Sequence, residues 1–142
     1  LPYINPKLSL ETECERGAYI VKMHSHENKV TLVASGSEVE LALNVYDELK
    51  KNNIDSKVVS MPCQELFDKQ TDDFKRNILD EETLIVTIEA GNVASWSKYV
   101  GDKGMTLGID RFGESAPYKK VYENLNLSVE KIVTAIQKRL RK

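Results

Sequence analysis

Glu89 is the first residue whose type and position could do chemistry. It follows the strongly apolar run LIVTI, where a buried strand ends, and a carboxylate there could accept a proton as a general base. No His or Lys stands beside it in the sequence to act as its partner. We therefore favour a structural role, in which the carboxylate binds backbone N–H groups of the following helix.

The turn Ser35–Gly36–Ser37–Glu38 is a second candidate, because the free N–H groups at the start of a helix can hold an anion. The turn has neither the GxGxxG nor the Walker pattern of phosphate-binding loops. Glu38 and Glu40 place carboxylates in the first helical turn, and these oppose a bound anion. We favour helix capping, with Ser37 and Glu40 as a capping box, and keep an anion site at Gly36 and Ser37 as the alternative.

Two further candidates follow other strands. Asp110 and Arg111 form an adjacent acid and base that could grip a phosphate or carboxylate, or pair with a neighbouring domain. A solvated or structural ion pair is the simpler interpretation. Cys63 lies where a strand passes into a helix, a place that stabilises a thiolate. No His lies near it to activate it, so we expect a buried, inert thiol.

His24 and His26 alternate, so on an extended strand they would share a face and could bind one metal ion. They are the only histidines and lie where the apolar pattern gives way to the polar stretch SHENK, so we expect no metal site. Trp96, Tyr99 and Val100 form either a docking surface or the packing face of a short helix, and both interpretations stay open.

These residues need a sheet to position them. Four short runs rich in β-branched residues predict buried strands, and helical patterns separate them: Val30–Ala34, Lys57–Ser60, Leu84–Ile88 and Thr106–Ile109. Strands joined through helices run parallel. A fifth strand, Ala18–Met23, is so close to Val30 that the two would be antiparallel if they were neighbours. We expect a three-layer α/β/α fold with a mixed, mostly parallel five-stranded sheet and one antiparallel strand.

Helical spacing of apolar residues predicts a helix over 38–53, ending at Asn52–Asn53, and a last helix capped by Ser128. The apolar face of that last helix consists of Val129, Ile132, Val133, Ile136 and Leu140. Between the second and third strands, the sequence predicts a short helix, a break near Thr71 and a second helix.

The 142 residues carry a net charge of −2, with 41% hydrophobic and 30% charged residues, which is the balance of one globular domain. Lys and Arg are spread along the chain, so we expect no nucleic-acid partner. Cys14 and Cys63 stand far apart, which fits reduced thiols in a cytoplasmic protein. No apolar run approaches the roughly 20 residues of a membrane span, so no membrane contact is expected.

The chain starts at Leu1 rather than Met, which fits a piece of a longer protein. Pro2 and Pro6 hold the first residues extended, as in a linker. We expect an interdomain linker over 1–14 and a folded domain over 15–142.

Five segments resemble, in order, the C-terminal domain of the transketolase family: TLVASGSEVELAL (31–43), KVVSMPCQELFDKQ (57–70), VTIEAG (86–91), KYVG (98–101) and GIDRFGESAP (108–117). ERGAYIVK (15–22) resembles the segment that follows the family's interdomain linker. The pyruvate dehydrogenase beta subunit and deoxyxylulose phosphate synthase share this fold, but SMPCQELFDKQ with DRFGESAP is more similar to transketolase. Dihydroxyacetone synthase, a related enzyme, stays open as an alternative.

The resemblance implies a parent enzyme, a homodimer, that transfers a two-carbon ketol unit between sugar phosphates of the pentose phosphate pathway. Such an enzyme uses thiamine diphosphate and a divalent metal ion, Mg or Ca. The family's metal-binding GDG…N motif belongs to an earlier domain; Gly101–Asp102–Lys103–Gly104 is similar but lacks the second Gly. The resemblance therefore implies that this chain holds no catalytic, cofactor or metal residue, packs against the preceding pyrimidine-binding domain and is inactive alone.

Two rival functions remain at this stage. One is a regulatory or small-molecule-binding α/β domain with an anion site at the carboxyl ends of the strands, near Gly36, Glu89 and Asp110. The other is a self-contained enzyme that uses Cys63 or Glu89.

Overall fold

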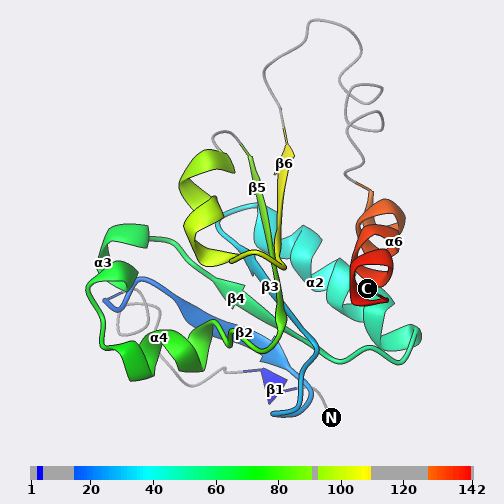
Figure 1. Cartoon of the computed structure of the whole chain (residues 1–142), viewed down its shortest axis with the longest axis horizontal. Helices are drawn as coiled ribbons and strands as arrows, with labels where there is room; N and C mark the ends of the chain where they lie inside the picture. Colours follow the sequence, from blue (N-terminus) through cyan, green and yellow to red (C-terminus); the bar gives the residue numbers. More distant parts are fainter. Residues whose placement is uncertain (1–2, 5–14, 91–92, 110–127, 142) are drawn as a thin grey trace, which may run out of the picture.

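The computed structural model describes residues 3–4, 15–90, 93–109 and 128–141. These residues build a three-layer α/β/α arrangement around one sheet (Figure 1). Helices α2 (Glu38–Lys51) and α6 (Val129–Leu140) cover one face of the sheet. Helices α3 (Gln64–Asp68) and α4 (Asp72–Ile78) and the 3₁₀-helix η1 (Val93–Tyr99) cover the other.

All five expected strands are present: β2 (Tyr19–Met23), β3 (Val30–Ala34), β4 (Ser56–Ser60), β5 (Leu84–Ala90) and β6 (Met105–Ile109). The order across the sheet is β1-β2-β4-β3-β5-β6. Strands β4, β3, β5 and β6 are parallel, and β2 is antiparallel to β4. Since β2 lies beside β4 and not beside β3, the short connection between β2 and β3 passes an intervening strand instead of forming a hairpin.

A sixth strand comes from the segment that the sequence predicts to be an extended linker. Strand β1 (Tyr3–Ile4) pairs antiparallel with β2, with Ile4 opposite Lys22. Being antiparallel to β2, it runs in the same direction as the main parallel strands, so β2 remains the one antiparallel strand.

One of the two predicted helix caps is confirmed, because the Ser128 Oγ accepts a hydrogen bond from the backbone N–H of Lys131 (3.2 Å). The break expected near Thr71 is also present, and the structure adds a cap there: the Thr71 Oγ1 accepts a hydrogen bond from the backbone N–H of Phe74 (3.1 Å). The capping box at Ser37 and Glu40 is wrong. Ser37 has helical backbone angles, φ −67° and ψ −19°, and makes no capping bond. A capping serine needs extended backbone to turn its oxygen back onto the helix.

The predicted end of α2 is confirmed, because Asn52 is its C-cap and Asn53 follows with a φ of +63°. Asn is among the few residues that adopt this left-handed conformation readily. The chain then turns directly into β4.

The strands alternate between two buried clusters, as the period of two in a strand requires. Leu32, Val58 and Val86 face α2 and α6. Val33, Val59 and Ile85 face the other layer, where they meet two buried aromatic side chains, Phe67 and Trp96. Trp96 is 7% exposed, so the short helix packs onto the sheet through it.

Candidate functional site

The carboxyl ends of β3 and β5 lie side by side, and there the structure brings together two candidates from the sequence, the turn Ser35–Gly36–Ser37–Glu38 and Glu89. Ala34 pairs with Ile88, so Ser35 follows β3 next to Glu89 on β5. The Ser35 backbone N–H and its Oγ both donate hydrogen bonds to Oε2 of Glu89, at 2.6 Å and 2.8 Å. Glu89 is 7% exposed, and hydrogen bonds to a charged acceptor are the strong ones.

The carboxylate of Glu89 thus binds a backbone N–H group, as the structural interpretation expects, but on a different element. The expected partner is the helix that follows β5, whereas the donor is the turn between β3 and α2. Glu89 therefore fixes the entry into α2 from a neighbouring strand.

The start of α2 carries a second buried carboxylate. Glu38 is 5% exposed, and its Oε2 accepts a hydrogen bond from Ser37 Oγ at 3.1 Å. Gly36 and Ser37 themselves are exposed, and Gly36 has a φ of +57°, which favours glycine. An anion at this turn would meet Glu38 and Glu89, so the local charge opposes it.

The other two candidates of this edge, Asp110 and Arg111, lie outside the described residues. Strand β6 ends beside β5, with Glu89 opposite Gly108 and Ala90 opposite Ile109. The structure therefore gathers Gly36, Ser37 and Glu89 at one edge of the sheet and leaves the acid–base pair undescribed.

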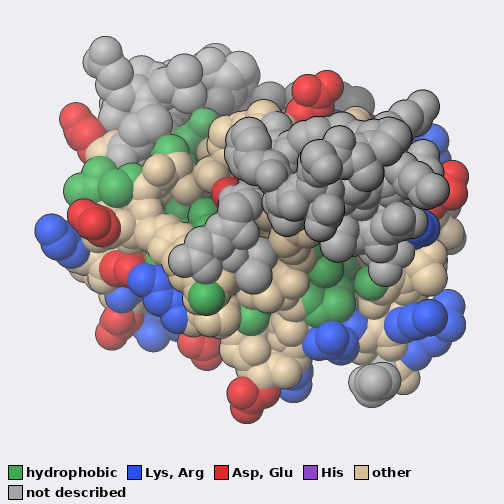
Figure 2. All heavy atoms as spheres, turned by 90° about the horizontal axis from the view of Figure 1, so that it is seen from above, with side chains coloured by type: hydrophobic (Ala, Val, Ile, Leu, Met, Phe, Trp, Pro, Cys, Tyr) green, Lys and Arg blue, Asp and Glu red, His purple; other side chains and the backbone are tan. Residues whose placement is uncertain are grey.

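Seen from this end, Lys and Arg side chains mix with Asp and Glu side chains on the left of the described surface, whereas several Lys and Arg side chains lie together at its lower right (Figure 2). The expectation of no nucleic-acid partner stays a prediction.

Cys63 and the two histidines are not brought together. Cys63 follows β4, is half-buried and occupies the N-cap position of α3. His24 and His26 are exposed and follow β2, whose last residue pairs with Lys57 near the start of β4. They lie at the opposite edge of the sheet from Cys63. Among the residues that the structure describes, no three His, Cys, Asp or Glu side chains gather closely enough to hold a metal ion.

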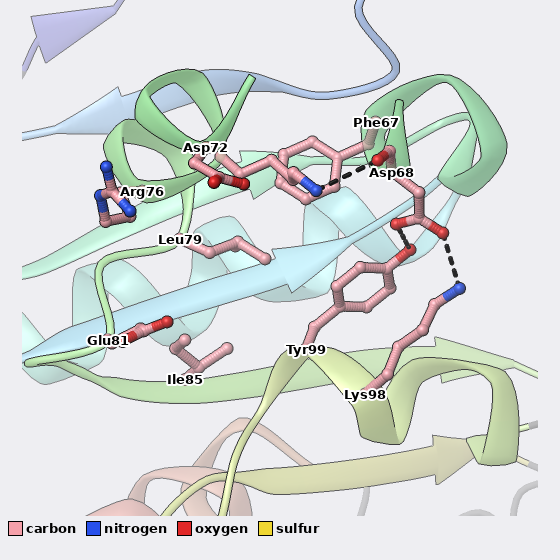
Figure 3. A pocket seen from close by; sticks show the side chains of 10 residues that line it. Phe67, Asp68, Asp72, Arg76, Leu79, Glu81, Ile85, Lys98 and Tyr99 are labelled. Atoms are coloured by element: carbon pink, nitrogen blue, oxygen red, sulfur yellow. Dashed lines mark hydrogen bonds and ion pairs between the residues drawn. The ribbon is translucent and has the colours of Figure 1, made fainter. Parts of the chain in front are cut away.

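A cleft between α3, α4 and η1 contains a polar cluster that sequence reasoning missed (Figure 3). Its volume is about 310 Å³. Asp68 accepts hydrogen bonds from Tyr99 Oη (2.8 Å) and Lys98 Nζ (2.7 Å), one on each carboxylate oxygen. Lys75 adds a hydrogen bond to the backbone carbonyl of Asp68 (3.1 Å).

These contacts fix the charge states in the cleft. Burial alone would raise the pKa of Asp68, but the hydrogen bonds from Lys98 and Tyr99 and the charge of Lys75 outweigh it and hold that pKa below its usual value. Burial and the hydrogen bond to Asp68 raise the pKa of Tyr99 above its usual value. Asp68 is therefore a carboxylate whose two oxygens already accept hydrogen bonds, and Tyr99 is a neutral phenol. Neither is suited to act as a general base.

The cleft cluster joins the three elements α3, α4 and η1 instead. Tyr99 stands edge-on against Phe67, with ring centroids 5.8 Å apart, and against Trp96 at 6.0 Å. The sequence singles out Trp96 and Tyr99 as aromatic residues, but nothing in it connects them to Asp68, 31 residues earlier than Tyr99.

No helix among the described residues is long and apolar enough to cross a membrane.

The family model of the "Transketolase-like TK C-terminal domain" matches residues 17–128. The chloroplastic transketolase of Solanum tuberosum is 44% identical over 123 residues, which are 84% of this chain and 17% of that protein. The transketolase of Bacillus subtilis is 42% identical over 130 residues, 90% of this chain and 20% of that protein. The chain thus spans about a fifth of the length of these relatives.

Solved structures give the same result. The transketolase of Leishmania mexicana superimposes with a TM-score of 0.80 at 34% identity, over 94% of this chain and 19% of that chain. The transketolase of Campylobacter jejuni superimposes with a TM-score of 0.76 at 39% identity, over 88% and 19%. A split-gene transketolase, described as an inactive beta4 tetramer, shares the fold with a TM-score of 0.67 at 21% identity, over 97% and 47%.

Proposed function

The chain belongs to the transketolase family as its C-terminal domain, and from this premise we propose that its full-length parent transfers a two-carbon ketol unit between sugar phosphates. The parent would use thiamine diphosphate and a divalent metal ion, Mg or Ca, and act in the pentose phosphate pathway as a cytoplasmic homodimer. Its relatives carry the transketolase name, and this chain corresponds to about a fifth of their length.

We propose that the domain itself is a scaffold that supports the reacting domains and binds no cofactor. The observation that carries this proposal is the Glu89–Ser35 contact, because the carboxylate at the strand ends already holds two donors of its own chain. The described residues also offer no cluster of metal ligands, so they do not fit the metal that accompanies thiamine diphosphate. We derive no chemical step through either group.

The strand-end surface is proposed as the contact with the preceding pyrimidine-binding domain. Its residues are Gly36, Ser37 and Glu89 together with Asp110 and Arg111. Gly36 and Ser37 are exposed, and no described residue other than the two chain neighbours of Gly36 has an atom within 4 Å of the position that a Cβ on Gly36 would take, so a neighbouring domain has room to approach. We keep 1–14 as the connecting segment and 15–142 as the domain, with Tyr3–Ile4 of that segment adding strand β1.

A domain exchange tests the scaffold role. This chain would replace the C-terminal domain of the Bacillus subtilis transketolase, and ketol transfer would be measured with thiamine diphosphate and Mg²⁺. We expect the chimera to be active, and its Glu89→Gln variant to keep kcat within about threefold while losing thermal stability, because Glu89 holds the backbone at Ser35 and takes part in no chemical step.

Calorimetry on the 142-residue chain provides the complementary measurement, with thiamine diphosphate and Mg²⁺ as titrants. The expected result is no saturable heat. Tight cofactor binding to the isolated chain, or a fall in kcat of a hundredfold or more in the Glu89→Gln chimera, would show that the domain carries part of the chemistry.

A further inference from the structure

The amino edge of the parallel strands, at the lower end of the sheet in Figure 1, contains a buried lysine that the proposed function does not use. Lys57 is the second residue of β4 and is 5% exposed. Its Nζ donates one hydrogen bond, to the backbone carbonyl of Asn77 at 2.9 Å. An ammonium can donate three hydrogen bonds. Within the described part of the chain, the other two find no protein acceptor.

No carboxylate of the described residues contacts the lysine. The charge of Asp80 acts on Lys57, yet the two form no ion pair within 4.0 Å among the described residues. Burial lowers the pKa of Lys57, and the charge of Asp80 opposes this only in part. A charged group that is taken out of water costs free energy unless a counter-charge or hydrogen bonds compensate for it. The free-energy cost of burying the charge of Lys57 is therefore only partly offset by the contacts that the described residues make with it.

Lys57 opens onto a pocket of about 410 Å³, which is within the size range of small-molecule sites. Arg76 of α4 and His26 of the loop between β2 and β3 line the same pocket, so basic side chains converge on it from three different elements. Asp80 is the acidic residue of the lining, and one of its carboxylate oxygens already accepts the backbone N–H of Glu82 at 2.9 Å.

Arg76 is the basic side chain of this pocket that can most easily turn toward a ligand. Its guanidinium pairs with Asp73 at 2.7 Å, but both side chains are largely exposed, and such a pair is weak. A dianion in the pocket would compete well for the guanidinium, which matches the oxygens of a phosphate group geometrically.

We propose that this pocket binds a small anion of the phosphate or phosphomonoester class, with Lys57 as its buried anchor and Arg76 and His26 as further contacts. The anion would supply the acceptors and the counter-charge that Lys57 lacks. The proposal is independent of the parent enzyme's reaction, because it rests on the amino edge of the sheet and not on the strand-end surface.

Calorimetric titration of the 142-residue chain in a phosphate-free buffer tests the pocket, with inorganic phosphate and glycerol 3-phosphate as probes and glycerol as the uncharged control. We expect saturable binding of both phosphates and none of glycerol. Lys57→Met is expected to weaken binding at least about tenfold, the effect of losing a charge-assisted hydrogen bond. Lys29→Met is the matched control, because Lys29 is an exposed lysine of the same sheet edge that does not line this pocket; its effect should stay below about twofold.

NMR of the wild-type chain keeps the proposal testable if Lys57→Met does not fold. The Lys57 side-chain resonances should shift on addition of phosphate, and the pKa of Lys57 should rise, because a nearby anion favours the charged form. Arg76→Gln, on an exposed side chain, should weaken binding about threefold.

Three outcomes would overturn the proposal. They are an absence of saturable phosphate binding, an equal loss of affinity in Lys57→Met and Lys29→Met, and phosphate binding that leaves Lys57 resonances unmoved. The second would indicate general attraction to surface charge, and the third a site elsewhere on the chain.

Discussion

The contacts of Glu89 show whether the carboxyl end of β5 has a catalytic or a structural role. A carboxylate beside free backbone donors has two uses: it can accept a proton during a reaction, or it can hold the backbone in place. In this domain it does the second, because both donors of Ser35 point at the same oxygen. The entry into α2 is thereby tied to β5.

We predict that Glu89→Gln destabilises the chain by about 1–2 kcal/mol, since the neutral amide retains the shape of the side chain but loses the charge that strengthens both hydrogen bonds. Urea denaturation at pH 7 measures the change. Glu40→Gln is the matched control on the exposed side of α2 and should stay within about 0.5 kcal/mol. Equal effects of the two variants would contradict the structural role of Glu89.

The lowered pKa of Asp68 should make the free energy of unfolding depend on pH. Its pKa in the folded chain lies below the ordinary value of 3.8, so its stabilising contribution is complete at neutral pH and is lost as the pH falls below that value. Because the Asp68 side chain is more than a third exposed, the effect is small, below about 1 kcal/mol.

Thermal melting at a series of pH values should therefore show Asp68→Asn less stable than wild type at pH 6, with the difference shrinking between pH 4 and pH 2. Asp102→Asn removes an exposed carboxylate outside this cluster and serves as the control. A difference that grows in acid would mean that Asp68 is not held in its charged form.

At the scale of the element, the same residue type acts differently before different helices. Ser37 and Ser128 both precede a helix with an apolar face. Ser128 has extended backbone angles, φ −76° and ψ 154°, and caps α6, whereas Ser37 already has helical angles and donates to Glu38 instead. The backbone conformation of the preceding turn, and not the residue type, decides which serine is a cap.

We predict that Ser128→Ala and Thr71→Ala each destabilise the chain by about 1 kcal/mol, because each removes the acceptor of one helix N–H group. Ser37→Ala should change stability by less than about 0.5 kcal/mol. The three variants would be compared by urea denaturation. A loss at Ser37 as large as at Ser128 would indicate that Ser37 caps α2 in solution.

At the scale of the whole molecule, the strand order places β3 at the centre of the parallel strands. Each of its five residues is buried, and it pairs with β4 on one side and β5 on the other. Strand β2 is only half-buried along its length and contains a register shift between Ile20 and Lys22. The centre of the sheet is therefore more deeply buried than its β1–β2 side, and we expect it to be the more stable of the two.

Hydrogen exchange followed by NMR should reveal this gradient. We predict the slowest exchange for backbone amides of β3 and its neighbours in β4 and β5, and faster exchange for β1 and β2, because local opening follows the number of buried contacts that must break. Exchange in β2 as slow as in β3 would mean that the antiparallel pair opens only when the whole domain unfolds.

The sequence by itself determined the elements and their family. Runs of β-branched, apolar residues located the expected strands, because strands covered on both faces need apolar side chains at every position. Helical spacing of apolar residues and the polar residues between helical segments located the helices, the break at Thr71 and the cap at Ser128. Only the tertiary structure decided which strands are neighbours: β2 lies beside β4, and Tyr3–Ile4 joins the sheet.

The contacts that define each site also needed the fold. Glu89 meets Ser35 across 54 residues, Asp68 meets Tyr99 across 31, and Lys57 meets Asn77 across 20. Periodicity reports which face of its own element a side chain occupies, and it carries no information on the partner that another element brings to that face. That partner is fixed by strand order and packing, which exist only once the chain has folded.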